Sequence, residues 1–493
     1  MKFLLLFLPF VLSYLLQDTP EASYWVAWLG SIFILWFSLS GRLKKLPGGY
    51  SLRFQLFRPI VFTQLVFATY TALTSVFYFL AVRRGELFVL PEGWAPPSIA
   101  MAAKAQGYYV LAHAAVTTGM FLAMNYEDSG MYAIRARWGH SRFLLGIASA
   151  FFLLTLITSQ MPSMFQLTFR FREIATAAAV FSFALALINK EGTLVWLNAL
   201  VFTLTIVSAL LSGWKEEVLV LLIFFFLVLF PYYRRATLIV GSISLTAFVL
   251  IMPAYSAIYR PLAWYGNTSK EEASSMAFKA ILSGEADLTT ISQAFARDRL
   301  SEIGLFVGYL QQVPDKRPFY GSRLVEQSLV NLVPRMLWPE KPNTEALVME
   351  RVYENNIYSR RAIISAKPQF VVDGYLSAGA IGIILSCLMY GVLASVASRF
   401  AERWFGGYMM GSGLVYSGLF QIFWRGNSFE FFVGIVFWST LLMVVMFHLG
   451  RSLGIVQRDY TVRPPVPLRP IPVAAARAVI VERDRTRTTV PGV

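Results

Sequence analysis

The residues with the clearest capacity for chemistry are cations that stand beside stiff backbone late in the chain. Residues 331–343 read NLVPRMLWPEKPN, which puts Arg335 and Lys341 next to prolines and close to Trp338. Proline fixes its own φ and favours extended geometry in the residue before it. Cations on such backbone, beside an aromatic ring, could bind an anionic ligand that carries carbohydrate. The alternative is a proline-rich loop that only fastens the edge of a folded segment.

Further cations lie close to apolar runs, where a charged side chain usually has a partner because it is costly there. Arginine can hold a phosphate group by two hydrogen bonds at once. The remaining candidate phosphate-binding residues are Lys215, Arg360, Arg361, Arg170 and Arg172, and we expect the last two to precede an apolar run. Lys215 is followed by Glu216 and Glu217, so an internal ion pair is the alternative to ligand binding.

Carboxylates are the candidate proton acceptors, and the sequence offers Asp373, Glu217 and Glu354 without deciding among them. Histidine is a weaker candidate because His113 falls inside an apolar run. The sequence has no GxxxxGK[ST] loop, no HExxH and no Cys/His cluster with metal-ligand spacing. We therefore expect no metal or cofactor, and the pattern argues against an ATP-driven pump or a metal hydrolase.

The elements that position these residues are predicted to be membrane helices. Apolar residues make up 56% of the chain and charged residues 14%, and runs of about 20 apolar residues are long enough to cross a bilayer. The sequence predicts an all-α, polytopic membrane protein with about twelve transmembrane helices. The predicted spans are residues 3–16, 24–38, 60–82, 108–124, 143–158, 174–188, 194–211, 218–230, 238–258, 370–395, 408–424 and 429–449.

Lysine and arginine counts in the short loops predict the orientation. With the N-terminus inside, the inner short loops carry roughly twice as many Lys and Arg residues as the outer ones. Both termini are then cytoplasmic and the long polar stretch is extracytoplasmic. The +15 net charge follows from this topology and a basic tail, so nucleic acid is not an expected partner.

The predicted topology divides the chain into four parts. Residues 1–258 are N-terminal transmembrane helices, 259–369 a large extracytoplasmic loop, 370–449 C-terminal transmembrane helices, and 450–493 a disordered basic tail. Within the loop, helical spacing of apolar residues predicts helices near 275–282, 288–311, 323–332 and 345–353. We expect these helices to form a small cap on the outer membrane surface.

The chain resembles the bacterial Wzy-type oligosaccharide repeat-unit polymerases, which are related to the O-antigen ligases. The resemblance covers most of the length: about a dozen spans, one large outer loop late in the chain, and two motifs. The motif residues are Pro334, Arg335, Leu337, Trp338, Pro339, Lys341 and Pro342, then Asp373, Tyr375, Gly379 and Gly382. Two departures are Lys215, where a Ser-x-Arg turn is common, and Ala378, where an aromatic residue usually precedes the glycine.

This resemblance implies a membrane glycosyltransferase of polysaccharide biosynthesis in the bacterial inner membrane. Its substrates would be oligosaccharides linked to undecaprenyl diphosphate, with membrane lipid around it and a chain-length regulator and a flippase as candidate partners. It implies catalytic roles for Arg335, Asp373 and Glu217. The substrate-binding residues would be Lys215, Lys341, Arg360, Arg361, Arg170, Arg172, Trp338 and Tyr375.

Two other functions stay open from the sequence alone. A transporter of lipid-linked glycans or solutes would explain the spans and the buried cations, but not the long helical loop. A lipid-linked monosaccharide transferase would usually carry an acidic outer loop near the N-terminus, and residues 17–23 are too short for one. Convergence of the charged residues on one outer site would favour a polymerase, whereas a polar path through the membrane would favour a transporter.

Overall fold

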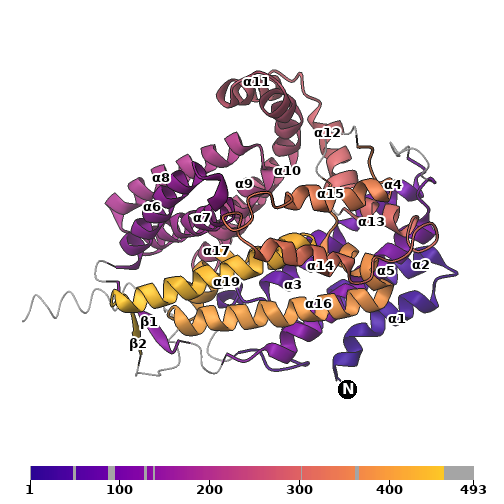
Figure 1. Cartoon of the computed structure of the whole chain (residues 1–493), viewed down its shortest axis with the longest axis horizontal. Helices are drawn as coiled ribbons and strands as arrows, with labels where there is room; N and C mark the ends of the chain where they lie inside the picture. The colour runs from indigo at the N-terminus through magenta and orange to yellow at the C-terminus, as the bar shows by residue number, and fades with distance from the viewer. Residues whose placement is uncertain are drawn as a thin grey trace, which may run out of the picture.

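The computed structural model describes residues 2–47, 51–86, 95–126, 130–136, 139–300, 302–360 and 366–459. Helices dominate these residues, which confirms the all-α class (Figure 1). Eight helical stretches are long and apolar enough to cross a membrane. They are α2 (Pro20–Leu39), α3 to α4 (Phe62–Arg83), α6 (His140–Ser159), α7 with the preceding turn (Pro162–Ile188), α8 (Gly192–Ser212), most of α10 (Arg234–Tyr265), α16 (Phe370–Trp404) and α19 (Phe429–Ser452).

The other four predicted spans are helical but differ from a full, uniform crossing. α1 (Leu8–Leu15) and α9 (Lys215–Leu229) are short. α5 (Ile99–Ala123) is long but carries polar residues along its length. Residues 408–425 are broken into η7 (Tyr408–Tyr416), α17 (Ser417–Leu419) and α18 (Ile422–Arg425). Of the twelve predicted crossings, eight are therefore helices that are long and apolar enough to span a membrane.

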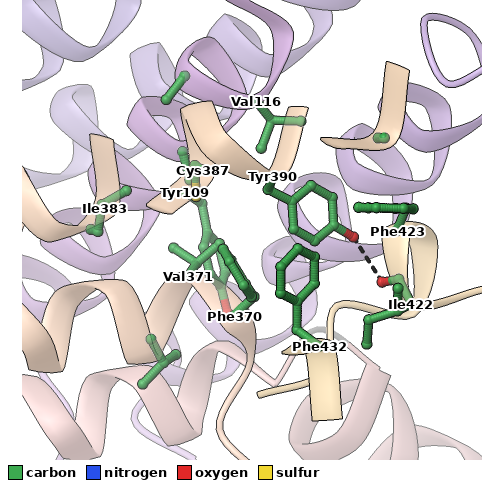
Figure 2. Close-up of a cluster of buried hydrophobic side chains, with 14 of the residues drawn as sticks. Tyr109, Val116, Phe370, Val371, Ile383, Cys387, Tyr390, Ile422, Phe423 and Phe432 are labelled. Carbon is green, nitrogen blue, oxygen red and sulfur yellow. Dashed lines mark hydrogen bonds between the residues drawn. The ribbon is translucent and has the colours of Figure 1, made fainter. Parts of the chain in front are cut away.

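The core forms where α5 and α16 approach each other closely. A Cβ on Gly119 would lie 2.1 Å from the Leu388 carbonyl oxygen, and a Cβ on Gly391 would lie 2.1 Å from the Val116 carbonyl oxygen. Small residues therefore set this distance, as is common between membrane helices. Figure 2 shows the aromatic side of the core, where the Tyr390 hydroxyl donates to the Ile422 carbonyl at 2.8 Å.

The segments that connect the helices contact one another at the two ends of the helices. At one end, which we call the loop end, Glu21 pairs with Arg83 at 3.3 Å. At the other, which we call the tail end, the Lys44 ammonium donates to the Met124 carbonyl at 2.7 Å. The tail end also holds the antiparallel pair of β1 (Tyr132–Ile134) and β2 (Val456–Arg458). Each contact joins segments that the sequence predicts on one side of the membrane.

The long segment between α10 and α16 contains several short helices, as predicted. They are α11 (Lys270–Leu282), α12 (Leu288–Phe295), η5 (Ala296–Leu300), α13 (Ile303–Leu310), α14 (Arg323–Leu329), η6 (Val330–Leu332) and α15 (Thr344–Glu354). The helix expected over residues 288–311 is interrupted, and Glu302 takes a left-handed φ of 54° there. The segment also begins later than residue 259, because α10 continues to Tyr265.

A break in α16 explains part of the second motif. Ala378 and Gly379 have non-helical φ and ψ, and Gly379 has a φ of 60°, which glycine adopts without strain. The break frees backbone carbonyls, and the long segment satisfies two of them. The Tyr320 amide donates to Leu376 at 2.8 Å, and the Gly321 amide donates to Ser377 at 3.0 Å. The motif therefore fastens the long segment to a membrane helix.

The part of the tail that the structure describes is ordered, contrary to the prediction of disorder from residue 450. α19 continues to Ser452, and β2 follows within a few residues. The backbone of β2 pairs with β1, which holds this stretch in place. The prediction for residues 460–493 lies outside the described residues.

Candidate functional site

A cluster of charged side chains lies at the loop end, where α7, α9 and α18 meet. Arg172 on α7 (Phe165–Ile188) pairs with Glu217 in the first turn of α9 at 2.7 Å. α9 starts here because Gly213, with a φ of 72°, turns the chain sharply after α8. The structure thus brings together Arg172 and Glu217, two residues that the sequence singles out separately.

The neighbouring arginine of α7 is buried in the same cluster. Arg170 pairs with Glu173, one turn along the helix, at 2.5 Å, and donates to the Leu419 carbonyl at 3.0 Å. Its side chain is only 7% exposed, whereas that of Arg172 is 43% exposed. The span predicted over residues 174–188 therefore begins too late, because α7 starts at Phe165 and contains both arginines. Their ion pairs explain how charged residues are accommodated in a membrane helix.

One further cation, Arg425, completes the cluster, and Lys367 lies near it. Arg425, the last residue of α18, lies 3.8 Å from Glu216, and its Nε is buried without a hydrogen-bond partner among the described residues. The Lys367 ammonium lies 4.3 Å from the centre of the Phe431 ring and 6.0 Å from that of Trp214. Arg425 is not among the residues predicted from the sequence, although an arginine at the end of an apolar run indicates a nearby partner. Lys215 begins α9, but its side chain lies outside what the structure describes.

Each of the three arginines lies against a glutamate, so an anion would bind here only by displacing a carboxylate. Guanidinium groups in a partly water-excluded site interact with phosphate more strongly than they would in water. The glutamates can compete with a ligand for the arginines, or one of them can accept a proton from it. Glu217 pairs with Arg172, the most exposed of the three arginines, whereas Glu216 is more exposed at 57% but lies 3.8 Å from Arg425. We call the side chains of Arg170, Arg172, Glu173, Glu216, Glu217 and Arg425 the loop-end charge cluster.

Hydrogen bonds within the proline-rich motif hold its own backbone in place. The Arg335 Nη1 donates to the Lys341 carbonyl at 2.9 Å, and the Lys341 Nζ donates to the Val333 carbonyl at 3.0 Å. Lys341 is buried, which lowers its pKa, and the nearby Arg335 guanidinium lowers that pKa further. Both cations stabilise the loop, which is the alternative that the sequence left open. Trp338 is exposed beside them.

Asp373 occupies a buried ion cluster rather than an open site. Arg351 on α15 donates to the Asp373 carboxylate at 2.8 Å and to the two oxygens of Glu430 at 2.5 and 2.8 Å. All three side chains are at most 2% exposed. Burial disfavours the charged guanidinium, but Asp373 and Glu430 more than offset this and raise the pKa of Arg351. Asp373 therefore joins α15 to α16 and α19, and a substrate cannot reach it in this arrangement.

Arg351 and Glu430 are not among the site residues predicted from the sequence. Glu430 carried a signal, because it is an acidic residue in the first turn of a membrane helix and implies a nearby cation. Arg351 is harder to identify, because it lies in a polar stretch that contains several arginines. Only its place on the buried face of α15 distinguishes it from Arg360.

Among the residues that the structure describes, the other predicted site residues make no contact with the loop-end charge cluster. Arg360 pairs with Glu350 at 2.5 Å and is exposed. Glu354 accepts from Tyr320 at 2.8 Å and from Arg323 at 3.0 Å. Tyr375 is buried, and its hydroxyl donates to the Val313 carbonyl at 2.8 Å. Arg361 lies outside the described residues.

The interior of the helices also contains polar groups. His113 is fully buried on α5, stacks on Phe67 at 5.1 Å, and neither ring nitrogen has a hydrogen-bond partner among the described residues. A cavity of about 30 Å³ lies nearby and is lined in part by Thr63, Phe67 and Gln369. This volume holds about one water molecule. His113 lies too deep to serve as a base at the loop end, as the sequence suggested.

The fold and the cluster define a polytopic helical membrane protein with a charged site at one end of its helices. The chain belongs to the family described as a domain of unknown function (DUF8712), whose model matches residues 8–458. Neither a curated protein nor a solved structure matches the chain. No group of three His, Cys, Asp or Glu side chains that could hold a metal ion occurs in the described part of the chain.

Proposed function

We propose that this protein is a polysaccharide polymerase of the Wzy type in the bacterial inner membrane. It would transfer a growing glycan from undecaprenyl diphosphate to the next lipid-linked repeat unit at the outer membrane face. In this proposal the chain crosses the membrane about twelve times, both termini are cytoplasmic, and the loop end faces outward. The observation that carries the proposal is the convergence of Arg170, Arg172 and Arg425 with Glu217 at the loop end.

The reaction makes one bond and breaks another. The oxygen of a sugar hydroxyl on the acceptor bonds to C1 of the growing chain, and the bond from C1 to the diphosphate oxygen breaks. The diphosphate leaves with the electron pair, so negative charge grows on it during the reaction. Arg172 and Arg425 would stabilise that charge, which is the main task of such a site. Glu217 would accept the hydroxyl proton.

Under this proposal, the candidate residues divide into those that can contact the substrate and those that hold the surrounding structure. Arg172, Glu217 and Arg425 are partly exposed and can reach a ligand at the membrane surface. Arg170 is buried and positions Leu419, and through it the chain near α18. Asp373 and Arg335 hold the architecture around the site rather than the substrate.

Substitutions in the cluster test the proposal. Arg172→Gln and Arg425→Gln should each lower the amount of polymer formed per folded protein by about 10²–10³-fold, as is seen when a charge-stabilising donor is removed. Glu217→Gln should lower it too, while lipid-linked substrate still binds. The matched control is Arg84→Gln, because Arg84 is an exposed arginine at the same end that pairs only weakly with Glu86 at 3.7 Å. Unchanged polymer formation in all three cluster variants would refute the assignment.

A transporter is the second candidate, and the buried polar groups favour it. His113, Thr63 and Gln64 are buried between the helices, as they would be beside a path across the membrane. In a transporter, His113→Phe would abolish movement of the lipid-linked glycan. In a polymerase, the same substitution would leave the reaction at the loop end largely intact. Glycan translocation and polymer length, measured on one variant, therefore separate the two functions.

A further inference from the structure

Five large apolar side chains on the long segment are exposed together. Val325 and Leu329 lie on α14, and Met336, Leu337 and Trp338 follow within the proline-rich motif. Leu337 is 75% exposed and Met336 is 61% exposed. We call these five residues the apolar patch. Large apolar side chains exposed so close together along the chain indicate a surface that contacts something other than water.

The residue between the two halves of the patch shows how deep the patch lies. Asn331 contacts three residues of α19 that are spaced one helical turn apart. Its Nδ2 donates to the Glu430 carbonyl at 3.1 Å, and its own carbonyl accepts from the Trp438 indole at 3.3 Å. Between them, a Cβ on Gly434 would lie 3.1 Å from the Asn331 Cβ, so glycine permits the close contact. Asn331 is therefore level with Gly434.

Asn331 therefore lies deeper in the membrane than the first residue of α19. With a rise of 1.5 Å per residue, Gly434 is about 8 Å inside the start of α19 at Phe429. α19 has 24 residues and is about 36 Å long, against a hydrocarbon thickness of about 30 Å. If the helix is centred, about 3 Å of it protrudes at each end, which puts Asn331 about 5 Å inside the hydrocarbon. Figure 1 agrees, because α14 runs alongside α16 and α19 rather than across their ends.

The faces of α14 fit the same position. Leu324 and Ser328 are buried against the protein. Val325 and Leu329 form a second, exposed apolar face. Arg323 forms part of a third, polar face and reaches Glu354 at 3.0 Å. A helix with separate protein-facing, apolar and polar faces is suited to the boundary between membrane and water.

We propose that the apolar patch is embedded in the lipid bilayer, so that the α14 to Trp338 segment is a re-entrant membrane anchor. The expected occupant is lipid, because α14 packs against α19, and α19 exposes the apolar side chains of Phe437 and Leu441 farther along the same helix. Trp338 then lies at the depth where tryptophan is enriched, and Arg335 lies beside the lipid headgroups. This differs from a cap resting on the membrane surface. It does not depend on the proposed function.

Spin labels on the full chain in vesicles test the proposal. Single cysteines are introduced by Leu329→Cys, Met336→Cys and Leu337→Cys in a Cys387→Ser background, and each is labelled with a nitroxide. Oxygen, which concentrates in lipid, and a water-soluble nickel chelate are then compared as relaxing agents. Met336 and Leu337 are well exposed, so these substitutions remove little packing and the variants should fold.

Matched controls come from the same segment. Glu326→Cys lies on the polar side of α14, and Glu340→Cys lies in the proline-rich motif, and both side chains are exposed. We expect each spin label at the three patch positions to be several-fold more accessible to oxygen than to the nickel chelate. At the two controls we expect the nickel chelate to have the greater access. Greater access of the nickel chelate at the patch positions would place the patch in water. Protection from both agents would mean that protein covers it, and either result overturns the proposal.

Discussion

Arg351 shows at the residue scale how the long segment is attached to the membrane helices. Its guanidinium is buried with two carboxylates, from α16 and α19. A buried pair of this kind adds little net stability compared with apolar residues, but losing one partner leaves a charge that water cannot solvate. The cluster therefore stabilises one specific docking of α15.

Removing the guanidinium should be strongly destabilising. We expect Arg351→Met to lower the free energy of unfolding by about 3–5 kcal/mol, because Asp373 and Glu430 are left buried without a cation. Adding Asp373→Asn and Glu430→Gln to that variant should restore much of the loss. Thermal unfolding of the purified protein checks both expectations. A single variant that unfolds at the wild-type temperature would contradict this role.

Glu354 gives a pH-dependent contribution in the same region. Burial works against its ionisation, yet hydrogen bonds from Tyr320 and Arg323 lower its pKa below the usual value. A lowered carboxyl pKa means that this stability is present above the unfolded value of about 4.3 and is lost as the pH falls through the folded value. Glu354→Gln should therefore reduce the loss of thermal stability on acidification below pH ~4.3. An identical pH profile for both proteins would contradict the prediction.

Single residues were only partly predictable from the sequence. Arg172 and Glu217 can be identified from the sequence because charged residues near apolar runs need partners, but nothing in the sequence pairs them with each other. The prolines around Arg335 and Lys341 make these two cations strong candidates in the sequence. The structure shows that their donors bind carbonyls of the same loop. The prolines indicate a stiff backbone, whereas the partner of each cation depends on three-dimensional packing.

At the scale of elements, the glycines between α5 and α16 determine how closely the central helices pack. The sequence located both helices, since hydropathy and length suffice for that. It did not reveal the breaks in α16 at Gly379 or in residues 408–425, because an apolar run reads the same whether its backbone is regular or broken. The Asn331 contacts with α19 were equally hidden, since they join residues about 100 positions apart.

A methyl group at the α5–α16 contact should disrupt it. We expect Gly119→Ala to lower the thermal unfolding temperature clearly, because its Cβ would meet the backbone of α16 at Leu388, which cannot move aside alone. Gly146→Ala on α6 is the matched control, because a Cβ there has nothing within 4 Å. It should be neutral, since alanine is also the better helix former. Equal effects of the two substitutions would contradict this account of the core.

For the whole molecule, the direction of the chain in the membrane decides which end meets the substrate. Arginines and lysines concentrate in the short loops predicted to be inside. A reporter fused after Lys316 should therefore read extracytoplasmic, and fusions after Arg235 or Arg403 should read cytoplasmic. The opposite pattern would put the loop-end charge cluster on the cytoplasmic side and remove the basis for the proposed function.

Loss of the protein, followed by analysis of lipid-linked glycans, tests the central claim most directly. Without a polymerase, we expect cells to accumulate single repeat units on undecaprenyl diphosphate at the outer face of the membrane and to lack polymer. Wild-type protein should restore polymer, and the Arg172→Gln and Arg425→Gln double variant should not. If single units accumulated at the inner face instead, or if polymer still formed without the protein, the polymerase assignment would be contradicted.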